Sequence, residues 1–519
     1  RQIVLQNMVD QNYISKMDME NALSDDVYDR IQNVNTATKE TNSHYSYFTD
    51  ELIEQVTEAL MKKLGYTESQ ASNLVYSGGL KIYTTQDPKI QAIVDEEVND
   101  PGNYTVAKYS VEYRLSVNHA DGTTQHYSEE NLRAYRKNTL GDTSFEGLYN
   151  SKEEVQADID RYKEWLLKDG DDVIAERQNL ILQPQASFFI MDQHTGEVKA
   201  LSGGRGEKTA SRTLNRATNV YRQPGSSFKV LTAFAPAIDT CGATLGTVYY
   251  DAPYTIGTKT FRNWWGESRG FTGYSNIREG IIYSMNIVAV RTLMETVTPQ
   301  LGVEYAENLG ITSLTKDDLG AALSLGGITK GVSNMELTAA YAAIANGGVY
   351  TTPRFFTKIL DHDGKVLIDN EPETKQVLKD STAFLLTDAM SESMKANRKF
   401  ARSGVSINST STRAALTGMS AAGKSGTTTS NNDVWFVGFT PYYTAGVWGG
   451  CDNNQKLKHG GVDNGGTSFH KDIWRNIMNR VHEGLEDPGF TVPDSVETAE
   501  ICRKSGKRAV SGVCDHDPR

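Results

Sequence analysis

The chain has 519 residues, of which 38% are hydrophobic and 23% are charged, and its formal net charge is −12. This length exceeds a single core and predicts two to four domains, and the ordinary globular composition excludes disordered and collagen-like chains. The negative charge argues against a nucleic-acid partner, because nucleic-acid binders present a basic face.

No stretch approaches the roughly 20 apolar residues that a membrane-spanning helix needs, and the chain opens on Arg1 without a signal-like leader. We therefore expect any membrane anchor to be absent from this chain. Four cysteines are too few for a disulfide framework. Cys502 and Cys514 are interpreted as either a disulfide or two free thiols. Asp515 and His516 lie beside Cys514 without a second ligand pair, so no metal site is predicted.

The first segments predict helices. Residues 1–24 predict two helices, with Ser15 as the N-cap of the second. Residues 46–65 predict an amphipathic helix that ends at Gly65. A strand, a turn and a helix are expected over residues 78–98. We expect residues 1–65 to form a helical unit.

Residues 66–185 are mixed and polar. An alternating run predicts a strand whose shared face holds Tyr109, Val111, Tyr113, Leu115 and Val117. The turn at 119–122 predicts a hairpin. Residues 151–167 predict a charged helix with a capping box made by Ser151 and Glu154. Because this segment carries no chemical constellation, we interpret it as a spacer or docking domain.

From residue 186 the chain is richer in apolar helices and glycine turns. Residues 186–204 predict a hairpin, residues 332–348 a long buried helix, and residues 433–450 two strands joined by a short turn. Strands at both ends with helices between them predict an α/β (α+β) domain over residues 186–485, its sheet closed by distant segments. Residues 486–519 form a tail.

Three short motifs carry the chemistry. The first is Ser226-Ser227-Phe228-Lys229, which follows a Pro-Gly turn and begins an apolar run. Residues three apart on a helix share a face, so Lys229 can reach the Ser226 hydroxyl. A serine nucleophile needs a base, and a buried lysine or one near another cation can serve. Taken alone, Ser226 would be interpreted as a helix cap.

The second motif is Ser284-Met285-Asn286, where a hydroxyl and an amide could relay a proton and hold a substrate amide. The third is Lys424-Ser425-Gly426-Thr427, just before the predicted strands. Glycine in an edge strand permits close backbone approach, and the free edge can pair with an extended peptide. A second cation at Lys424 would help to keep Lys229 neutral. Alone, Asn286 predicts a turn and Lys424 a solvated charge.

Similar short motifs occur elsewhere in the chain. Ser313-Leu314-Thr315-Lys316 leads into a solvated turn, and Lys504-Ser505-Gly506 lies in a basic tail with no strand after it. Their surroundings do not fit the chemistry. The three motifs in their observed order are those of class A β-lactamases and penicillin-binding proteins.

Four longer stretches extend the likeness over most of residues 66–480. They are RQPGSSFK, GKSGTTTSNNDVWFVGFTPYY, LGGITKGVSNMELTAAYAAIANGGVYTTPRF and SGGLKIYTTQDPKIQ. The chain resembles a class A penicillin-binding protein, a bifunctional peptidoglycan synthase. Residues 1–65 resemble the helical tail of the glycosyltransferase domain. We expect no glycan polymerisation, because the acidic motif and anchor of that domain are not in this chain.

The resemblance implies a fold of the penicillin-binding and serine β-lactamase type, with a central antiparallel sheet between helices and a small linker domain. It implies a DD-transpeptidase that acylates Ser226 with a stem peptide ending in D-Ala-D-Ala and passes the acyl group to a neighbouring stem. It further implies inhibition by β-lactams, cell-wall synthesis proteins as partners, no cofactor, and a place at the outer face of the bacterial cytoplasmic membrane.

The resemblance also assigns roles residue by residue. Ser226 is the nucleophile and Lys229 its base, while Ser284 and Asn286 serve proton transfer and substrate positioning. The terminal carboxylate is expected to lie at the third motif, whose residues are Lys424, Ser425, Gly426, Thr427 and Thr428. The backbone N–H groups of Ser226 and Thr427 are expected to form the oxyanion hole. Trp265 is interpreted either as part of a loop lining the cleft or as plain packing.

Other functions remain open from the sequence. A serine β-lactamase or a β-lactam-sensing receptor would share the motifs, but we find no Glu-x-x-Asn between Asn286 and Lys424 to activate the water of a β-lactamase. A DD-carboxypeptidase would form the same acyl-enzyme with water as the acceptor. A non-catalytic cell-wall scaffold on the same fold is the last alternative, and the intact motifs argue against it.

Overall fold

The computed structural model describes residues 2–11, 13–24, 44–395, 399–459, 462–463 and 466–514, which fall into two compact units, residues 1–45 and 46–519. The first unit contains α1 (Gln2–Asp10) and α2 (Lys16–Ser24). The N–H of Asp18 donates to Ser15 Oγ at 3.1 Å, which confirms the predicted cap of α2. Among the described residues, no helix combines the length and the apolar character needed to cross a membrane.

The second unit is built on a five-stranded antiparallel sheet in the order β17–β18–β19–β5–β6. Its strands are β5 (Gln185–Met191), β6 (Val198–Ser202), β17 (Ala422–Thr427), β18 (Asp433–Phe439) and β19 (Thr444–Gly450). The predicted hairpin and the predicted strand pair are both confirmed. Met191 of β5 pairs with Thr444 of β19, so distant segments close one sheet as expected. Strand β17 lies at the sheet edge.

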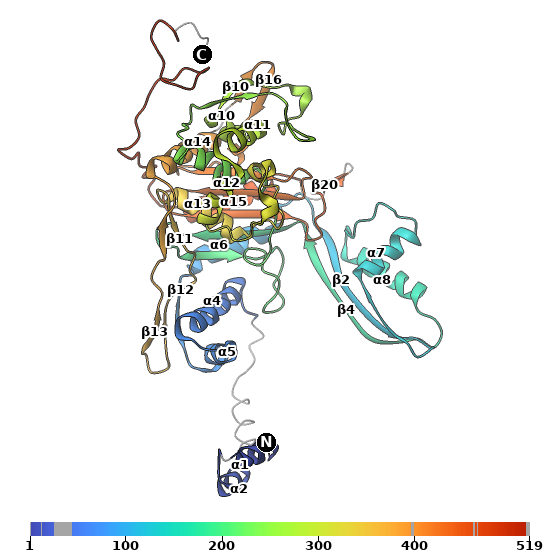
Figure 1. The fold of residues 1–519 in the computed structure, drawn as a ribbon. Coiled ribbons are helices and arrows are strands. Elements are labelled where there is room, and N and C mark those ends of the chain that lie inside the picture. Colours follow the sequence, from blue (N-terminus) through green and yellow to red (C-terminus); the bar gives the residue numbers. More distant parts are fainter. Residues whose placement is uncertain are drawn as a thin grey trace. The chain divides into compact units, whose positions relative to one another are not determined.

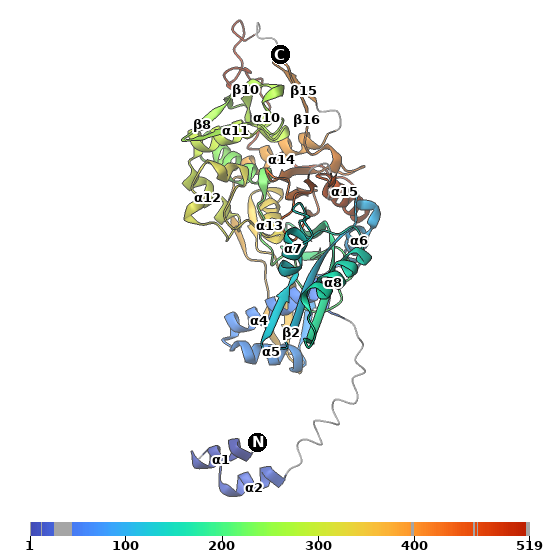
Figure 2. The same ribbon diagram turned by 90° about the vertical axis from the view of Figure 1, so that its right-hand side faces the viewer.

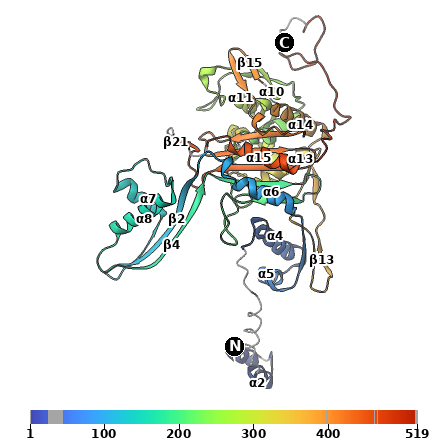
Figure 3. The ribbon, with the colours of Figure 1, turned by 180° about the vertical axis from the view of Figure 1, so that it is seen from behind.

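Helices cover both faces of this sheet (Figures 1 and 3). On one face α13 (Asn334–Ala345), the predicted buried helix, packs through Tyr341 into a core that includes Trp435. On the other face lie α6 (Pro88–Asn99) and α15 (Phe469–Val481), where Trp474 meets Phe436 with ring centroids 4.9 Å apart. Because side chains alternate along β18, one strand supplies both cores.

A helical layer with short hairpins lies beyond α13. Its main helices are α9 (Ala235–Asp239), α10 (Ile277–Ile282), α11 (Asn286–Arg291), α12 (Pro299–Asn308) and α14 (Asp380–Met394). Its short strands pair as β7 (Val248–Asp251) with β10 (Gly273–Asn276), β8 (Tyr254–Ile256) with β9 (Lys259–Phe261), and β15 (Lys399–Arg402) with β16 (Val405–Asn408). Two further pairs are β11 (Val349–Thr351) with β14 (Thr374–Gln376) and β20 (Lys458–His459) with β21 (Val462–Asp463).

The polar segment forms a separate sheet in the order β3–β2–β4, which we call the spacer sheet (Figures 1 and 2). Its strands are β2 (Lys108–Asn118), β3 (Thr124–Ser128) and β4 (Asp172–Gln183), covered by α7 (Glu129–Asn138) and α8 (Lys152–Leu166). The predicted alternation of β2 and its hairpin with β3 are confirmed. The predicted capping box is only half formed: Ser151 Oγ accepts from Glu154 N, but the Glu154 carboxylate accepts from Asn150 N instead.

The segment before the spacer sheet packs against the part of the chain that holds the five-stranded sheet. Strand β1 (Lys81–Thr84) pairs with β12 (Phe356–Leu360), which pairs with β13 (Val366–Asp369). Helix α4 (Tyr47–Leu64) precedes α5 (Glu68–Ser77), and Gly65 ends α4 in a left-handed conformation as predicted. The domain boundaries at residues 65, 185 and 485 remain predictions.

The contact between α13 and the sheet requires a glycine in β19. A Cβ built on Gly446 would lie 2.1 Å from Thr338 Oγ1 and 2.4 Å from Asn334 Oδ1. We predict that Gly446→Ala destabilises the second unit by about 1–3 kcal/mol, because an extra methyl group in a filled core forces its neighbours apart. The thermal unfolding midpoint measures this. Gly320→Ala is the matched control, since a Cβ there meets nothing within 4 Å. Equal midpoints for the two variants would contradict the prediction.

Candidate active site

The first motif lies in a tight turn against the edge strand. Ser226 is in the 3₁₀ turn Gly225–Ser227, followed by a π-helical turn, Val230–Phe234, rather than the regular helix that the sequence predicts. Pro236 accounts for the wide turn, because a proline cannot donate to the i−4 carbonyl and its ring clashes with it. Gly225 has φ +56°, and a Cβ there would lie 2.6 Å from Thr427 O. Only glycine allows the nucleophile turn to approach β17 this closely.

Lys229 is fully buried and brings the first two motifs together. Its Nζ donates to Ser284 O at 2.7 Å, to Asn286 Oδ1 at 2.7 Å and to Ser284 Oγ at 3.1 Å. These acceptors are neutral oxygens. The ammonium form of Lys229 is therefore hydrogen-bonded, although no charge in this set offsets its burial.

Ser284 connects Lys229 to the third motif. It lies between α10 and α11 with φ +53°, an uncommon conformation for a residue with a Cβ and one that is often found at functional sites. Its Oγ accepts from Lys424 Nζ at 2.9 Å as well as from Lys229. The structure thus brings the predicted residues Lys229, Ser284, Asn286 and Lys424 into one hydrogen-bonded cluster.

The electrostatics of this cluster favour a neutral base. Burial lowers the pKa of Lys229 well below its usual value, and the charge of Lys424 lowers it further. Burial also lowers the pKa of Lys424 to about 7, with a smaller contribution from the charge of Lys471. A neutral amine at Lys229 can accept a proton near neutral pH, which an ordinary surface lysine cannot.

Asn263 holds Asn286 in place and was missed by the sequence analysis. Its Oδ1 accepts from Asn286 N at 2.9 Å, and its Nδ2 donates to the buried Asp251 carboxylate at 2.7 Å. Asn286 Nδ2 in turn donates to Arg262 O at 2.9 Å, which leaves its Oδ1 facing Lys229. The only signal in the sequence was the position of Asn263 beside a tryptophan pair.

The two neighbouring tryptophans have different environments. Trp265 is 6% exposed, belongs to the large apolar core and donates to Gly270 O at 3.0 Å. Its burial favours the packing interpretation over the cleft-lining one. Trp264 is 48% exposed and donates to Tyr283 O, the residue before Ser284, at 2.9 Å. The exposed ring next to the motif is therefore that of Trp264.

The proposed carboxylate-binding residues lie along β17. Ser425 is buried and Thr427 is half-buried beside the nucleophile turn. The Thr428 hydroxyl accepts from the N–H groups of Asn432 and Asp433, so it closes the β17–β18 turn. The oxyanion hole of Ser226 and Thr427 N–H groups remains a prediction, which the close contact between Gly225 and Thr427 supports.

A polar cavity of about 300 Å³ adjoins this end of β17. It is lined by residues 221–223, 329–330, 428–430 and 432–433 together with Asn454. Lys330 and Arg222 supply positive charge and Asp433 negative charge.

The other sequence candidates lie apart from the cluster. Ser313 Oγ donates to Gly331 O, and Lys316 is exposed. The structure has all four cysteines as free thiols, including Cys502 and Cys514. Among the residues that the structure describes, no three His, Cys, Asp or Glu side chains cluster as metal ligands. Asp515 and His516 lie outside the described residues.

Comparison with known proteins shows the family to which the chain belongs. Residues 186–479 match the family described as the penicillin binding protein transpeptidase domain. Penicillin-binding protein 1A of Clostridium botulinum is 32% identical over 99% of this chain and 53% of its own length, so the chain spans about half of that relative.

Two solved structures share the fold. Penicillin-binding protein 1A from Haemophilus influenzae has a TM-score of 0.62 and 19% identity over 98% of this chain and 80% of its own. PonA1 from Mycobacterium tuberculosis, in complex with penicillin V, has a TM-score of 0.58 and 22% identity over 86% of this chain and 96% of its own.

The two-lysine arrangement predicts a pH effect. The Lys424 charge disfavours protonated Lys229, so Lys424→Met raises the pKa of Lys229. The rise of the Ser226 acylation rate with pH should then move to higher pH. The rate at neutral pH should also fall by about tenfold or more, since a hydrogen bond to a charged group contributes about 1.5–3 kcal/mol. The measurement is the rate of acylation by a penicillin from pH 5 to 10.

Lys316→Met is the matched control for this prediction, because Lys316 ends the similar Ser-x-x-Lys sequence outside the cluster. Its pH profile should match that of the unmodified chain. An unchanged profile for Lys424→Met would show that Lys424 does not set the protonation of Lys229.

Proposed function

The chain belongs to the penicillin-binding protein transpeptidase family, and from this premise we propose that it is the peptidoglycan DD-transpeptidase portion of a class A penicillin-binding protein. The observation that carries the proposal is the buried Lys229, whose Nζ is shared between Ser284 and Asn286 and lies near a second buried lysine. This arrangement supports Lys229, three residues after Ser226, as the base of the proposed reaction. A helix cap would need none of it.

In the proposed acylation, Lys229 Nζ takes the proton of the Ser226 hydroxyl, and Ser226 Oγ attacks the carbonyl carbon between the two terminal D-Ala residues. The N–H groups of Ser226 and Thr427 hold the oxyanion. When the amide bond breaks, the leaving D-Ala amine takes its proton through the Ser284 hydroxyl, which contacts both lysines at 2.9–3.1 Å. The product is an ester on Ser226 and free D-Ala.

In the second half-reaction, the amine of a neighbouring stem peptide attacks the ester. Lys229 accepts the proton of the attacking amine and Ser226 regains its own, so the site returns to its initial state. Asn286 is suited to orient the substrate amide, because Asn263 and Arg262 fix its side chain. Lys424, Ser425 and Thr427 are proposed to bind the terminal carboxylate. The proposed location is the outer face of the bacterial cytoplasmic membrane.

β-Lactams are proposed to acylate the same serine. A β-lactam presents a strained amide and a carboxylate, so Ser226 opens the ring and stays esterified. The structure of the similar PonA1 protein is described as a complex with penicillin V. The substrate of this chain is proposed on its own cluster of residues and not on that complex.

The first test is intact-protein mass after brief exposure to a penicillin. The unmodified chain should gain one persistent penicilloyl group, and Ser226→Ala should gain none. Ser227→Ala is a matched control, because Ser227 is the adjacent serine, with its hydroxyl donating to Pro224 O at 2.8 Å. It should still be acylated.

Other outcomes of this test separate the alternatives. Penicillin consumed without an adduct indicates a β-lactamase. Neither adduct nor consumption indicates the non-catalytic scaffold. An adduct on Ser226→Ala would place the nucleophile elsewhere.

A second test distinguishes transpeptidation from hydrolysis. The chain is incubated with a donor peptide ending in D-Ala-D-Ala and increasing concentrations of an amine acceptor. For a transpeptidase, the cross-linked product should replace the hydrolysed product as the amine rises, because both acceptors compete for one acyl-enzyme. Hydrolysis alone at every amine concentration would indicate a carboxypeptidase.

A further inference from the structure

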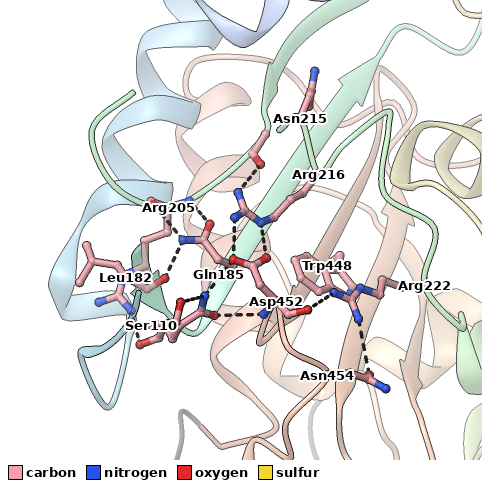
Figure 4. Close-up of polar contacts among 12 residues, drawn as sticks. Ser110, Leu182, Gln185, Arg205, Asn215, Arg216, Arg222, Trp448, Asp452 and Asn454 are labelled. Carbon is pink, nitrogen blue, oxygen red and sulfur yellow. Dashed lines mark hydrogen bonds and ion pairs between the residues drawn. The ribbon is translucent and has the colours of Figure 1, made fainter. Parts of the chain in front are cut away.

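Asp452 lies shortly after the end of β19 and contacts three other segments of the second unit. Figure 4 shows its carboxylate facing Arg216, whose Nε and Nη2 each donate to it at 2.7 Å. The Arg216 side chain is 7% exposed, and its Nη1 also donates to Gly203 O at 3.3 Å. The two-point ion pair fixes the direction of the Asp452 carboxylate.

The spacer sheet contacts Asp452 at the end of strand β4. Gln183, the last residue of β4, donates from Nε2 to Asp452 Oδ2 at 2.8 Å and accepts from Asp452 N at 3.2 Å. The same Nε2 donates to Ser110 Oγ of β2 at 3.1 Å. Gln183 and Ser110 are buried at 1% and 5% exposure. Two strands of the spacer sheet are therefore attached to one residue of the catalytic part.

The nucleophile segment is attached to the same residue. Arg222 lies four residues before Ser226, and its Nη2 donates to Asp452 O at 2.8 Å. Its guanidinium lies 5.5 Å from the Trp448 ring centroid (Figure 4). Its backbone pairs in both directions with Val332, at 3.0 and 2.9 Å.

The stretch between Arg222 and Ser226 has little freedom. Gln223 O accepts from Trp435 Nε1 at 2.9 Å, and Gly225 packs on the backbone of Thr427. A displacement of Arg222 must therefore pass along this short stretch to the serine. A misplacement of about 1 Å at a reacting group can cost about 100-fold in rate.

We propose that Asp452 is a positioning residue that ties the Ser226 turn to the spacer sheet, through Arg222 on one side and Gln183 on the other. The proposal rests on the proposed acylation of Ser226. The spacer sheet then acts on the chemical step, although it contributes no side chain to the catalytic cluster.

The test compares Gln183→Met, Arg222→Met and the double variant in acylation by a penicillin. Methionine keeps the length of each side chain and removes its polar contacts. Each single variant should slow the chemical step by about tenfold, while the dissociation constant of the non-covalent complex stays within twofold. The double variant should be no slower than the slower single variant, because both substitutions break the same connection between the Ser226 turn and the spacer sheet. A general loss of packing would change binding and the unfolding midpoint together.

Gln178→Met is the matched control, since Gln178 is an exposed glutamine of the same strand that bonds Gln156. It should acylate like the unmodified chain. Arg222→Lys should recover part of the rate lost in Arg222→Met, because an ammonium can still donate to Asp452 O. If Gln183→Met fails to fold, Ser110→Ala removes one contact of Gln183 and should slow acylation severalfold.

Two results would overturn the proposal. One is an acylation rate of Gln183→Met equal to that of the control Gln178→Met. If Gln183→Met does not fold, the same comparison is made between Ser110→Ala and Gln178→Met. The other is a double variant whose slowing is the product of the single effects, which would show two independent roles. If the unmodified chain itself is not acylated, the proposed function fails first and this inference with it.

Discussion

The active site depends on two lysine side chains buried against a single hydroxyl group. Lys229 and Lys424 are both fully buried, and their recorded hydrogen-bond partners are neutral oxygens of Ser284, Asn286 and Ser425. A buried ammonium without an anion is expensive, so the proton is released at a lower pH than in water. Burial thereby increases the fraction of Lys229 that is neutral, and so able to accept a proton, at neutral pH. The same two contacts make Ser284 a bridge along which a proton can move between the lysines.

This arrangement is supported by three separate parts of the fold. Lys229 follows the nucleophile turn and enters a helical segment within the large apolar core. Lys424 is on β17, which β18 holds by continuous pairing. Ser284 lies between two short helices in a left-handed conformation, a strained state that persists because its surroundings fix it. Each part is held by packing or strand pairing, as a site needing precise placement requires.

The sequence predicts many of the strands and main helices well, because their patterns are local, while the roles of the candidate catalytic residues remain predictions. The alternation around Tyr113, the cap at Ser15 and the glycine end at Gly65 are confirmed, since each depends on neighbours within a few residues. The spacing of the first motif predicts that Lys229 shares a helix face with Ser226, but this pattern gives no sign of the π-helical turn that Pro236 introduces. The order of the strands depends on pairing between segments that are far apart in the chain. The sequence indicated this pairing only by placing strands at both ends of the domain.

Contacts between distant segments could not be predicted from the sequence. Asn263 orients Asn286 from another loop, and nothing in its own neighbourhood distinguishes it from a turn residue. Trp264 and Trp265 are adjacent and chemically identical, yet only the packing of the core decides which ring is exposed. Glu154 shows the same limit at short range: a capping box is predicted, but Asn150 competes for the carboxylate and wins.

The path of the chain explains why the spacer sheet cannot behave as a free appendage. Its strand β4 ends at Gln183 and the catalytic strand β5 begins at Gln185, so one residue separates the two sheets. Arg205 closes this junction: its guanidinium lies 3.7 Å from the Tyr104 ring centroid and donates to Val106 O and Pro184 O, each at 3.3 Å. A flexible linker would let the two sheets move independently, whereas the contacts at this junction restrict their movement relative to each other. The spacer sheet is therefore connected directly to β5, which pairs with the central strand β19 of the five-stranded sheet.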